Sequence, residues 1–364
     1  MSAFSDALKK VNKDYKDCLV DLSGSEEYVG PIDPQYVFST GSPLIDEITC
    51  IGGLAGGRIS EIFGPEASGK STFLLSACAV LLKKNPNARV IYSDFEHAMS
   101  IDYAKKLGVP VEDRERFIFM QPTTLEDGIN AGIALVETGE ISLWIVDSLA
   151  AALPKQELEG AIGDVTVGLK ARVMAASLRK ITGLVSQFNT HFAVVNHVIA
   201  KIGGMGFGNP EDTPGGKALK FYASQRFKLT PAGFIRGKVR NEITGQQEDV
   251  KIGINVKVEI VKNKLGVPFR TAQVLIRFGE GFDNCLSAIQ IGVAKGAIEK
   301  VNASTYRFEG TAYRGLENFR NEVAADRDLY DRIINAINTA NSGSAGSTAE
   351  VESEEFDENI IDIE

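Results

Sequence analysis

The chain has 364 residues, of which 44% are hydrophobic, and carries a formal net charge of −9 at pH 7. This length and composition predict a globular protein, either one large domain with additions or two domains. The cysteines lie far apart and form no CxxC pair, which argues against a disulfide framework and a structural zinc site and favours a reducing compartment. They are Cys18, Cys50, Cys78 and Cys285.

The acidic charge is concentrated at the C-terminal end. Residues 350–364 hold eight acidic and no basic residues, which leaves 39 basic against 40 acidic residues in the rest of the chain. A nearly neutral body with an acidic tail is compatible with nucleic acid as a partner, although the overall charge alone would suggest otherwise.

Residues 2 to about 16 predict a short amphipathic helix, because Phe4, Leu8 and Val11 recur at helical spacing. The polar stretch "SGSEEYVGPIDP" that follows is typical of a linker. The N-terminus has no apolar core of the signal-peptide type, and no run approaches the roughly 20 apolar residues of a membrane span. We therefore expect a cytoplasmic protein that has no membrane partner.

Short β-branched runs then alternate with helix-length segments: "RISEIF", "RVIYSD", "RFIFM", "SLWIVD" and "HFAVVN". This alternation predicts an α/β fold with a mainly parallel sheet covered by helices on both faces. Three later runs, "SQRFKLT", "GINVKVEIVK" and "RTAQVLIRF", have no helices between them and predict an antiparallel extension. After about Gly279 we expect a small mixed unit that ends in the helix "LYDRIINAINTA", then a flexible linker and a disordered acidic end.

The segment "GPEASGKST" fits the pattern GxxxxGK[ST], with a strand pattern before it and a helix pattern after it. Its glycines let backbone N–H groups turn toward a β-phosphate, and the helix N-terminus adds partial positive charge. Lys70 can reach the β- and γ-phosphates, and the Ser71 hydroxyl can ligate Mg²⁺. We therefore expect an ATP-binding P-loop protein. The loop residues expected to bind nucleotide are Gly64, Pro65, Glu66, Ala67, Ser68, Gly69, Lys70, Ser71 and Thr72.

Carboxylates follow two of the predicted strands. "SLWIVDS" places Asp147 at the C-terminal end of an apolar strand, where open α/β sheets bind ligands, and we expect it to hold Mg²⁺ next to Ser71. "RVIYSDFEHA" offers Asp94 and Glu96 as the group that orients the attacking water in ATP hydrolysis. Spacing alone leaves the choice between these two open. His97 is expected to pack or to form hydrogen bonds rather than to catalyse.

At this point the sequence resembles the bacterial RecA recombinases. The resemblance is carried, in order and spacing, by "STGSPLIDEI", "GGLAGGRISEIFGPEASGKST", "DFEHAMSIDYAKKLGV", "VDSLAAALPKQELEGAIGD", "FGNPEDTPGGKALKFYAS" and "VKNKLGVPF". It runs from about Phe38 to Ala336. It implies a RecA-type P-loop core and a DNA-dependent ATPase that forms helical filaments on single-stranded DNA and exchanges homologous strands in recombination and DNA repair.

The resemblance also assigns residues of the ATP site. Glu96 matches the family's water-activating glutamate, and Tyr103 matches the aromatic residue that stacks on adenine. Lys262 and Lys264 match two lysines that reach ATP across the filament interface, and Phe221 matches an interface aromatic. ATP and Mg²⁺ are therefore the expected cofactors, and ATP would lie between neighbouring subunits.

Two glycine-rich DNA-binding loops are implied as well, at about residues 157–168 and 198–216. Such loops can bring backbone N–H groups close to DNA phosphates without reading sequence. Read without the family, both would be interpreted as flexible surface loops. The residues that match DNA-contacting positions of the family are Gly160, Val167, Arg172, Arg179, Ile202, Gly215 and Gly216. Of these, Val167 and Ile202 match the apolar residues that wedge between base triplets.

One departure from the family lies at the position that, in the family, acts as a sensor between the γ-phosphate of ATP and the second loop. "VVNHV" places His197 where cellular members usually have glutamine, whereas phage-encoded relatives and eukaryotic recombinases can carry histidine. A histidine can still donate to a phosphate oxygen, and its protonation would make the switch sensitive to pH. A phage origin is one explanation, in which case the protein would act in the host cytoplasm.

The resemblance divides the chain into an oligomerisation helix with its linker (residues 1–35), an ATPase core with the DNA-binding loops (36–278), a small C-terminal domain (279–340) and an acidic tail (341–364). The tail either competes with DNA for basic surface until Mg²⁺ or salt screens it, or serves solubility. Expected partners are single- and double-stranded DNA, further copies of the chain, and single-strand-binding and recombination mediator proteins.

Two other functions remain open from the sequence. One is a hexameric helicase or ring motor on the same core, and the other is a non-catalytic filament that presents a surface for repressor cleavage. Lys262 and Lys264 favour the filament over the ring. The intact set of Lys70, Ser71, Glu96 and Asp147 favours retained hydrolysis.

Overall fold

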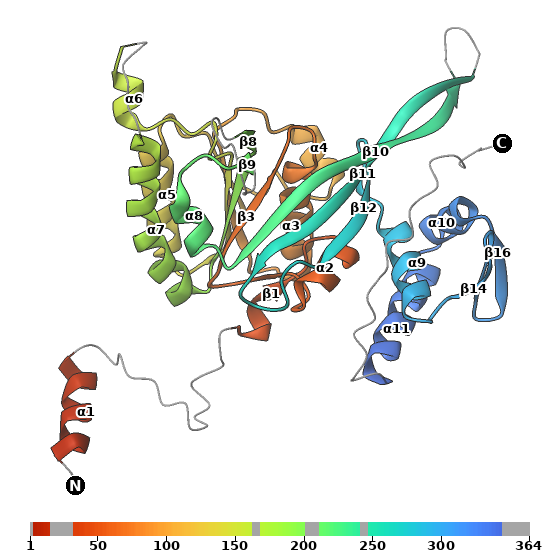
Figure 1. Cartoon of the computed structure of the whole chain (residues 1–364), viewed down its shortest axis with the longest axis horizontal. Helices are drawn as coiled ribbons and strands as arrows, with labels where there is room; N and C mark the ends of the chain where they lie inside the picture. Colours follow the sequence, from red (N-terminus) through yellow and green to blue (C-terminus); the bar gives the residue numbers. More distant parts are fainter. Residues whose placement is uncertain (1–2, 15–31, 162–167, 201–210, 241–246, 344–364) are drawn as a thin grey trace, which may run out of the picture.

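The computed structural model describes residues 3–14, 32–161, 168–200, 211–240 and 247–343. A large sheet with the strand order β13-β12-β11-β10-β3-β7-β6-β4-β5 forms the centre of this part of the chain (Figure 1). Its strands are β3 (Ile59–Gly64), β4 (Arg89–Asp94), β5 (Phe117–Met120), β6 (Ile141–Asp147), β7 (His191–His197), β10 (Gln225–Arg240), β11 (Gln247–Asn263), β12 (Thr271–Arg277) and β13 (Gly281–Phe282). The strands from β10 to β5 in this order pair in parallel, whereas β11, β12 and β13 pair antiparallel.

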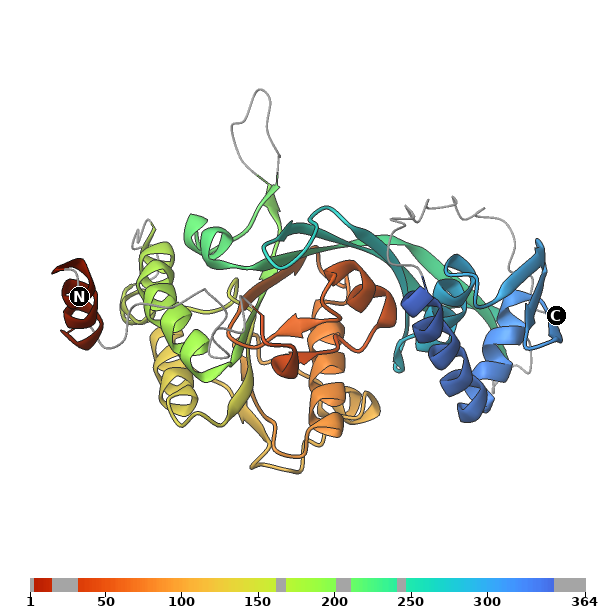
Figure 2. The same ribbon diagram turned by 90° about the horizontal axis from the view of Figure 1, so that it is seen from below.

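Helices cover both faces of the sheet, and the two faces have separate apolar clusters (Figures 1 and 2). Strand β6 shows the reason, because Leu143 and Ile145 belong to one cluster and Trp144 and Val146 to the other. Alternation of this kind along one strand buries both faces of a sheet. One face packs against α2 (Pro43–Thr49), α3 (Lys70–Lys84) and α4 (Ile101–Lys106), and the other against α5 (Leu125–Val136), α7 (Leu169–Phe188) and α8 (Lys217–Tyr222).

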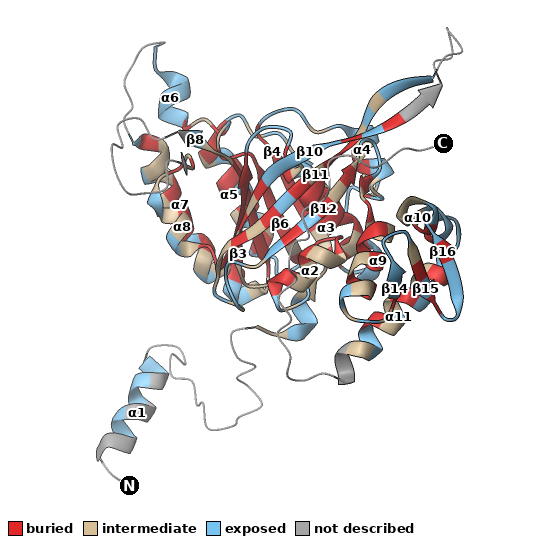
Figure 3. Cartoon of the chain, turned by 45° about the vertical axis from the view of Figure 1, so that its right-hand side comes forward, coloured by how far each residue is buried: buried red, intermediate tan, exposed pale blue. Residues whose placement is uncertain are grey.

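The burial pattern in Figure 3 follows this layering, with buried strands between half-exposed helices. The predicted α/β fold with a mainly parallel sheet and an antiparallel extension is therefore confirmed. Smaller elements complete the described core: η1 (Pro34–Tyr36), β1 (Val37–Phe38), β2 (Leu54–Ala55), α6 (Lys155–Glu159), β8 (Ile199–Ala200) and β9 (Glu211–Asp212). No described helix is long and apolar enough to cross a membrane.

The antiparallel extension is longer than the sequence predicts. Strand β10 pairs with β3 only over Gln225–Lys228, and β11 pairs with β12 only from Gly253 to Glu259. Beyond these stretches β10 and β11 pair with each other alone, and the resulting two-stranded ribbon projects from the sheet (Figure 1).

The C-terminal unit has its own apolar cluster, which includes Ile289, Phe319 and Ile333. It consists of α9 (Asn284–Ala294), β14 (Glu299–Asn302), β15 (Thr305–Phe308), β16 (Thr311–Arg314), α10 (Leu316–Ala325) and α11 (Arg327–Gly343). The buried carboxylate of Asp283 joins it to the sheet by accepting hydrogen bonds from Nε of Arg277 (2.6 Å) and Nε of Arg320 (2.9 Å).

Helix α1 (Ala3–Asp14) forms where the sequence predicts a helix and lies apart from the core in both views (Figures 1 and 2). The interior of the predicted linker and the acidic end of the chain lie outside the described residues.

Candidate active site

The phosphate loop joins the end of the fully buried strand β3 to the first turn of α3. Two of its glycines are required by geometry. A Cβ on Gly64 would lie 2.2 Å from the carbonyl oxygen of Leu229, and Gly69 has a φ of +86° at the N-cap of α3. The loop therefore brings its backbone and the N-terminus of α3 to one point, which is the arrangement that binds phosphate.

Lys70, the first residue of α3, folds back over this loop. Its Nζ donates to the carbonyl oxygens of Gly64 (3.1 Å) and Pro65 (2.6 Å). Burial lowers the pKa of Lys70, while the carboxylates of Asp147, Glu96 and Glu66 act in the opposite direction. The site thus holds one buried ammonium among acceptors, as a phosphate-binding lysine requires.

Ser71, on the first turn of α3, contacts Asp147 at the end of β6. The Ser71 hydroxyl donates to Oδ2 of Asp147 (2.8 Å), and the buried Tyr92 hydroxyl donates to the same oxygen (2.5 Å). Burial raises the pKa of Asp147, and these two hydrogen bonds oppose the rise. One hydroxyl and one carboxylate side by side fit Mg²⁺, which takes few protein oxygens and completes its shell with phosphate and water. The described residues contain no cluster of three or more metal-binding side chains.

The structure gives Asp94 and Glu96, between which spacing alone could not choose, different surroundings. Strand β4 ends at Asp94, whose side chain is 2% exposed and accepts hydrogen bonds from the backbone N–H groups of Glu96, Ala98 and Met99. Asp94 therefore shapes the turn, whereas Glu96 projects from it.

The Glu96 carboxylate receives two hydrogen bonds at one oxygen. Oε1 accepts the Ser148 hydroxyl and lies 3.0 Å from Nε2 of His197. Burial alone would raise the pKa of Glu96, but these contacts hold it below its ordinary value. Glu96 is therefore an ionised carboxylate at neutral pH, as a group that orients water must be.

Tyr103 lies on α4 beside the same loop. Its hydroxyl is 2.9 Å from the Thr72 hydroxyl on the first turn of α3, and burial raises the pKa of Tyr103. The contact places Tyr103 next to the end of the phosphate loop.

Lys262 and Lys264 do not join this group. Lys262 of β11 pairs in register with Arg226 of β10, and Arg226 pairs with Glu61 of β3. Lys262 therefore lies two strands away from β3. It is level with Glu61, which precedes Gly64 by about 10 Å along the strand. Nζ of Lys262 donates to the carbonyl oxygens of Lys220 (2.6 Å) and Phe221 (3.0 Å), and Nζ of Lys264 donates to that of Phe221 (3.3 Å). Burial, Lys264 and Arg226 lower the pKa of Lys262 to about 8.

The structure describes some of the residues that the resemblance implies for DNA contact. Gly160 is exposed at the end of α6, and Arg172 and Arg179 are exposed two turns apart on one face of α7. Neither arginine forms an ion pair with another described residue. Gly215 and Gly216 have positive φ and close the second loop where a Cβ would clash with Leu149 or Ala171. Val167 and Ile202 lie outside the described residues.

Sequence reasoning missed a buried polar network next to the site. Oε1 of Glu61, which is fully buried, accepts from Nδ2 of Asn196 (3.1 Å), and its Oε2 accepts from Nε of Arg226 (2.5 Å). The same Asn196 amide donates to the carbonyl oxygen of Pro214 at the end of the second loop (2.9 Å). The available signal was the lone glutamate inside the apolar run "RISEIF".

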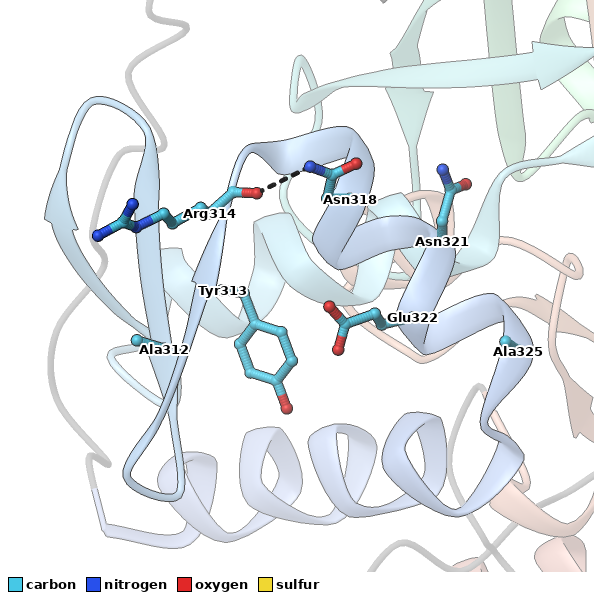
Figure 4. A pocket seen from close by; sticks show the side chains of 7 residues that line it. All are labelled: Ala312, Tyr313, Arg314, Asn318, Asn321, Glu322 and Ala325. Atoms are coloured by element: carbon cyan, nitrogen blue, oxygen red, sulfur yellow. Dashed lines mark hydrogen bonds between the residues drawn. The ribbon is translucent and has the colours of Figure 1, made fainter. Parts of the chain in front are cut away.

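A hollow of about 640 Å³ lies elsewhere, between β16 and α10 of the C-terminal unit (Figure 4). The ring of Tyr313 lies between β16 and α10 in this view, and it stacks on Phe319 with ring centroids 4.0 Å apart. None of the site residues predicted from the sequence lines this hollow, and its wall mixes small apolar, amide, aromatic and charged side chains. The lining residues are Ala312, Tyr313, Arg314, Asn318, Asn321, Glu322 and Ala325.

Fold and site together define a P-loop ATPase, in which an α/β sheet presents the phosphate loop and the Glu96 carboxylate at the same edge. The family model described as the RecA N-terminal domain matches residues 2–283. The chain belongs to the RecA family. It is therefore a DNA-dependent ATPase of recombination and DNA repair.

Several relatives support this assignment. Protein RecA of Syntrophus aciditrophicus is 38% identical over 328 residues, which are 90% of each chain. Protein RecA of Campylobacter fetus subsp. fetus is 38% identical over 351 residues, 96% of each chain. Protein RecA of Streptococcus pyogenes serotype M5 is 36% identical over 368 residues, 100% of this chain and 93% of that protein.

Proposed function

We propose that the chain forms a helical filament on single-stranded DNA, holds ATP between neighbouring subunits, and pairs and exchanges strands with duplex DNA. The observation that carries this proposal is the separation of two groups. Lys70, Ser71, Glu96 and Asp147 gather at the phosphate loop, whereas Lys262 and Lys264 gather at the carbonyls of α8 beside Phe221, which is 70% exposed. Two copies arranged head to tail would join the halves into one site.

Within one subunit, the loop backbone and Lys70 would bind the phosphates, and Tyr103 would stack on the base. Ser71 and Asp147 would hold Mg²⁺, which supplies charge neutralisation at the phosphates when bound. Glu96 would orient the attacking water, and His197 connects this carboxylate to the second loop. The hydrogen bonds that Glu96 accepts from Ser148 and His197 fix the position of its carboxylate and support its assignment as the group that orients water.

We propose that DNA lies along the two glycine-rich loops and α7. Arg172 and Arg179 would contact phosphates, and the backbone near Gly160, Gly215 and Gly216 would approach the strand closely. Val167 and Ile202 remain the proposed wedges between bases on the strength of the resemblance. Helix α1, which stands apart from the core, supports a division in which residues 1–35 dock on a neighbouring subunit.

The test is ATP hydrolysis with and without single-stranded DNA, using wild type, Lys70→Ala and Glu96→Ala. We expect DNA to stimulate wild-type hydrolysis, and both variants to lose roughly 100-fold or more of the stimulated rate. Wild-type hydrolysis that is indifferent to DNA would overturn the role assigned to the loops.

The ring motor is separated from the filament by electron microscopy with single-stranded DNA and a slowly hydrolysed ATP analogue. We expect filaments for wild type and short or absent filaments for the double variant Lys262→Ala and Lys264→Ala. Closed rings in the wild type would contradict the filament.

A further inference from the structure

The hydroxyl group of Tyr92 lies beneath the phosphate loop and is not explained by the roles above. Tyr92 is on β4, and the residue is 1% exposed. Its ring packs near Phe117 and Phe119, with centroids 6.2 and 6.3 Å away. A phenylalanine would fill this apolar space equally well, so the packing accounts for the ring but not for the hydroxyl.

The hydroxyl finds its partner in Asp147. It donates to Oδ2 at 2.5 Å, and this oxygen is the one that also accepts the Ser71 hydroxyl at 2.8 Å. Burying a hydroxyl is unfavourable unless it is hydrogen-bonded, so the contact is what makes a tyrosine acceptable at this position. The three residues come from β4, α3 and β6, which are brought together only by the fold.

Two donors on one oxygen restrict the rotation of the Asp147 carboxylate. Asp147 is 6% exposed, so water has little access to replace a lost donor. Groups that hold a metal-binding carboxylate by a hydrogen bond orient it and tune its affinity, and their loss typically weakens metal binding about 10- to 100-fold.

We propose that Tyr92 is a positioning residue that holds Asp147 in the orientation required for Mg²⁺ and so makes tight nucleotide binding depend on the metal. The proposal rests on the magnesium site assigned above to Ser71 and Asp147. Tyr92 acts through Asp147 and does not itself touch the metal or the nucleotide.

The test measures the affinity of a fluorescent ADP analogue for the full-length chain in EDTA and across a Mg²⁺ titration. With Tyr92→Phe we expect the affinity in EDTA to stay within about twofold of wild type. The Mg²⁺ concentration that gives half of the tightening should rise about tenfold. A structural role alone would change both affinities together, since it would not distinguish the metal-bound from the metal-free nucleotide.

Ser93→Ala is the matched control. Ser93 is the next residue of β4 and is fully buried, but its hydroxyl accepts from Nε1 of Trp144 (3.2 Å) on the other face of the sheet. We expect this variant to keep the wild-type Mg²⁺ titration. Thermal unfolding of both variants without ligand shows whether each is folded, and the ring retained in Tyr92→Phe preserves the core.

Two results would overturn the proposal. Identical Mg²⁺ titrations for wild type and Tyr92→Phe would overturn the role proposed for Tyr92 but would leave the assignment of the magnesium site standing. A wild-type chain whose ADP affinity ignores Mg²⁺ would instead overturn the magnesium site, and Tyr92 with it, so the two failures are distinguishable.

Discussion

Nε2 of His197 lies 3.0 Å from Oε1 of Glu96, and this contact joins the end of β7 to the proposed catalytic carboxylate. His197 also pairs in register with Gly64, the first residue of the phosphate loop. The second glycine-rich loop begins directly after this strand. An imidazole at this point can therefore engage either Glu96 or a phosphate oxygen, and a choice between these partners would link DNA at the loop to hydrolysis.

The first prediction concerns the hydrogen bond between this imidazole and Glu96. We expect His197→Ala, which removes the contact, to lower the DNA-stimulated rate of ATP hydrolysis by about tenfold, because a hydrogen bond to a charged group contributes about 1.5–3 kcal/mol. His197→Gln keeps a donor at this position and should retain most of the stimulated rate. Equal stimulated rates for wild type and His197→Ala, at saturating DNA and ATP, would contradict this link.

A second prediction follows from the lowered pKa of Lys262, about 8. Burial and the neighbouring Lys264 and Arg226 favour the neutral amine in the free subunit. If Lys262 meets ATP phosphates on assembly, it must be charged there, so assembly takes up a proton once the pH exceeds about 8. ATP-dependent binding to single-stranded DNA should therefore weaken as pH rises from 8 to 9.5.

Lys262→Arg provides the control for this effect, because a guanidinium stays protonated throughout that range. Fluorescence anisotropy of labelled single-stranded DNA measures the affinity for both proteins. An equal loss of affinity in wild type and Lys262→Arg would show that the pH dependence arises at another group.

The third prediction tests the buried network of Glu61, Asn196 and Arg226. Replacing Arg226 by methionine leaves the Glu61 carboxylate buried with only the Asn196 amide as a partner. Removing one member of a buried ion pair typically destabilises a protein by about 3–5 kcal/mol. We expect a loss of about 3 kcal/mol in the free energy of unfolding of the core, because Asn196 retains its hydrogen bond.

Urea unfolding followed by the fluorescence of Trp144 measures this loss, since the chain has one tryptophan and it lies in the core. The control is Arg89→Met, which breaks the more exposed pair of Arg89 with Glu140 (2.9 Å). That change should cost less than about 1 kcal/mol. Similar losses for the two variants would mean that the Glu61 pair contributes no more than a surface pair.

The sequence predicts the parts of this molecule that depend on local pattern. The alternation in "SLWIVD" follows the two buried faces of β6, and the spacing of Gly64, Gly69 and Lys70 predicts the loop that the structure contains. Spacing alone could not choose between Asp94 and Glu96, and only the resemblance assigned Glu96, because the choice depends on the residue at which β4 ends. The turn after Asp94, and the hydrogen bonds that this carboxylate accepts there, distinguish the two.

Local sequence pattern could not predict the long ribbon of β10 and β11 or the contact of Tyr92 with Asp147, and the reasons differ. Pro231 and Gly233 lie where the pairing of β10 and β11 shifts register, and such residues ordinarily indicate the end of a strand, so the long ribbon was not predicted. The contact of Tyr92 with Asp147 joins residues 55 positions apart, and "RVIYSD" alone gives no reason to treat its tyrosine as more than a core residue.

The last prediction concerns His191, which is the first residue of the central strand β7 and is fully buried. Nδ1 lies 2.7 Å from the carbonyl oxygen of Ala55 and Nε2 lies 2.8 Å from the Ser60 hydroxyl, so the neutral ring satisfies both of its nitrogens. Burial lowers the pKa of His191 to about 4, against an ordinary value of 6.5. Its contribution to stability is therefore complete above pH 6.5 and is lost as pH falls toward 4, by about 3 kcal/mol in total.

His191→Gln removes this titration while keeping a side chain that can hydrogen-bond to Ala55. Between pH 6 and 4.5 we expect the free energy of unfolding of wild type to fall by about 1 kcal/mol more per pH unit than that of the variant. Asp46, whose pKa burial raises to about 6, stabilises the folded chain as pH falls. Because both proteins contain Asp46, its effect cancels in the comparison. Equal slopes by Trp144 fluorescence would mean that His191 takes up a proton in the folded state as readily as in the unfolded chain.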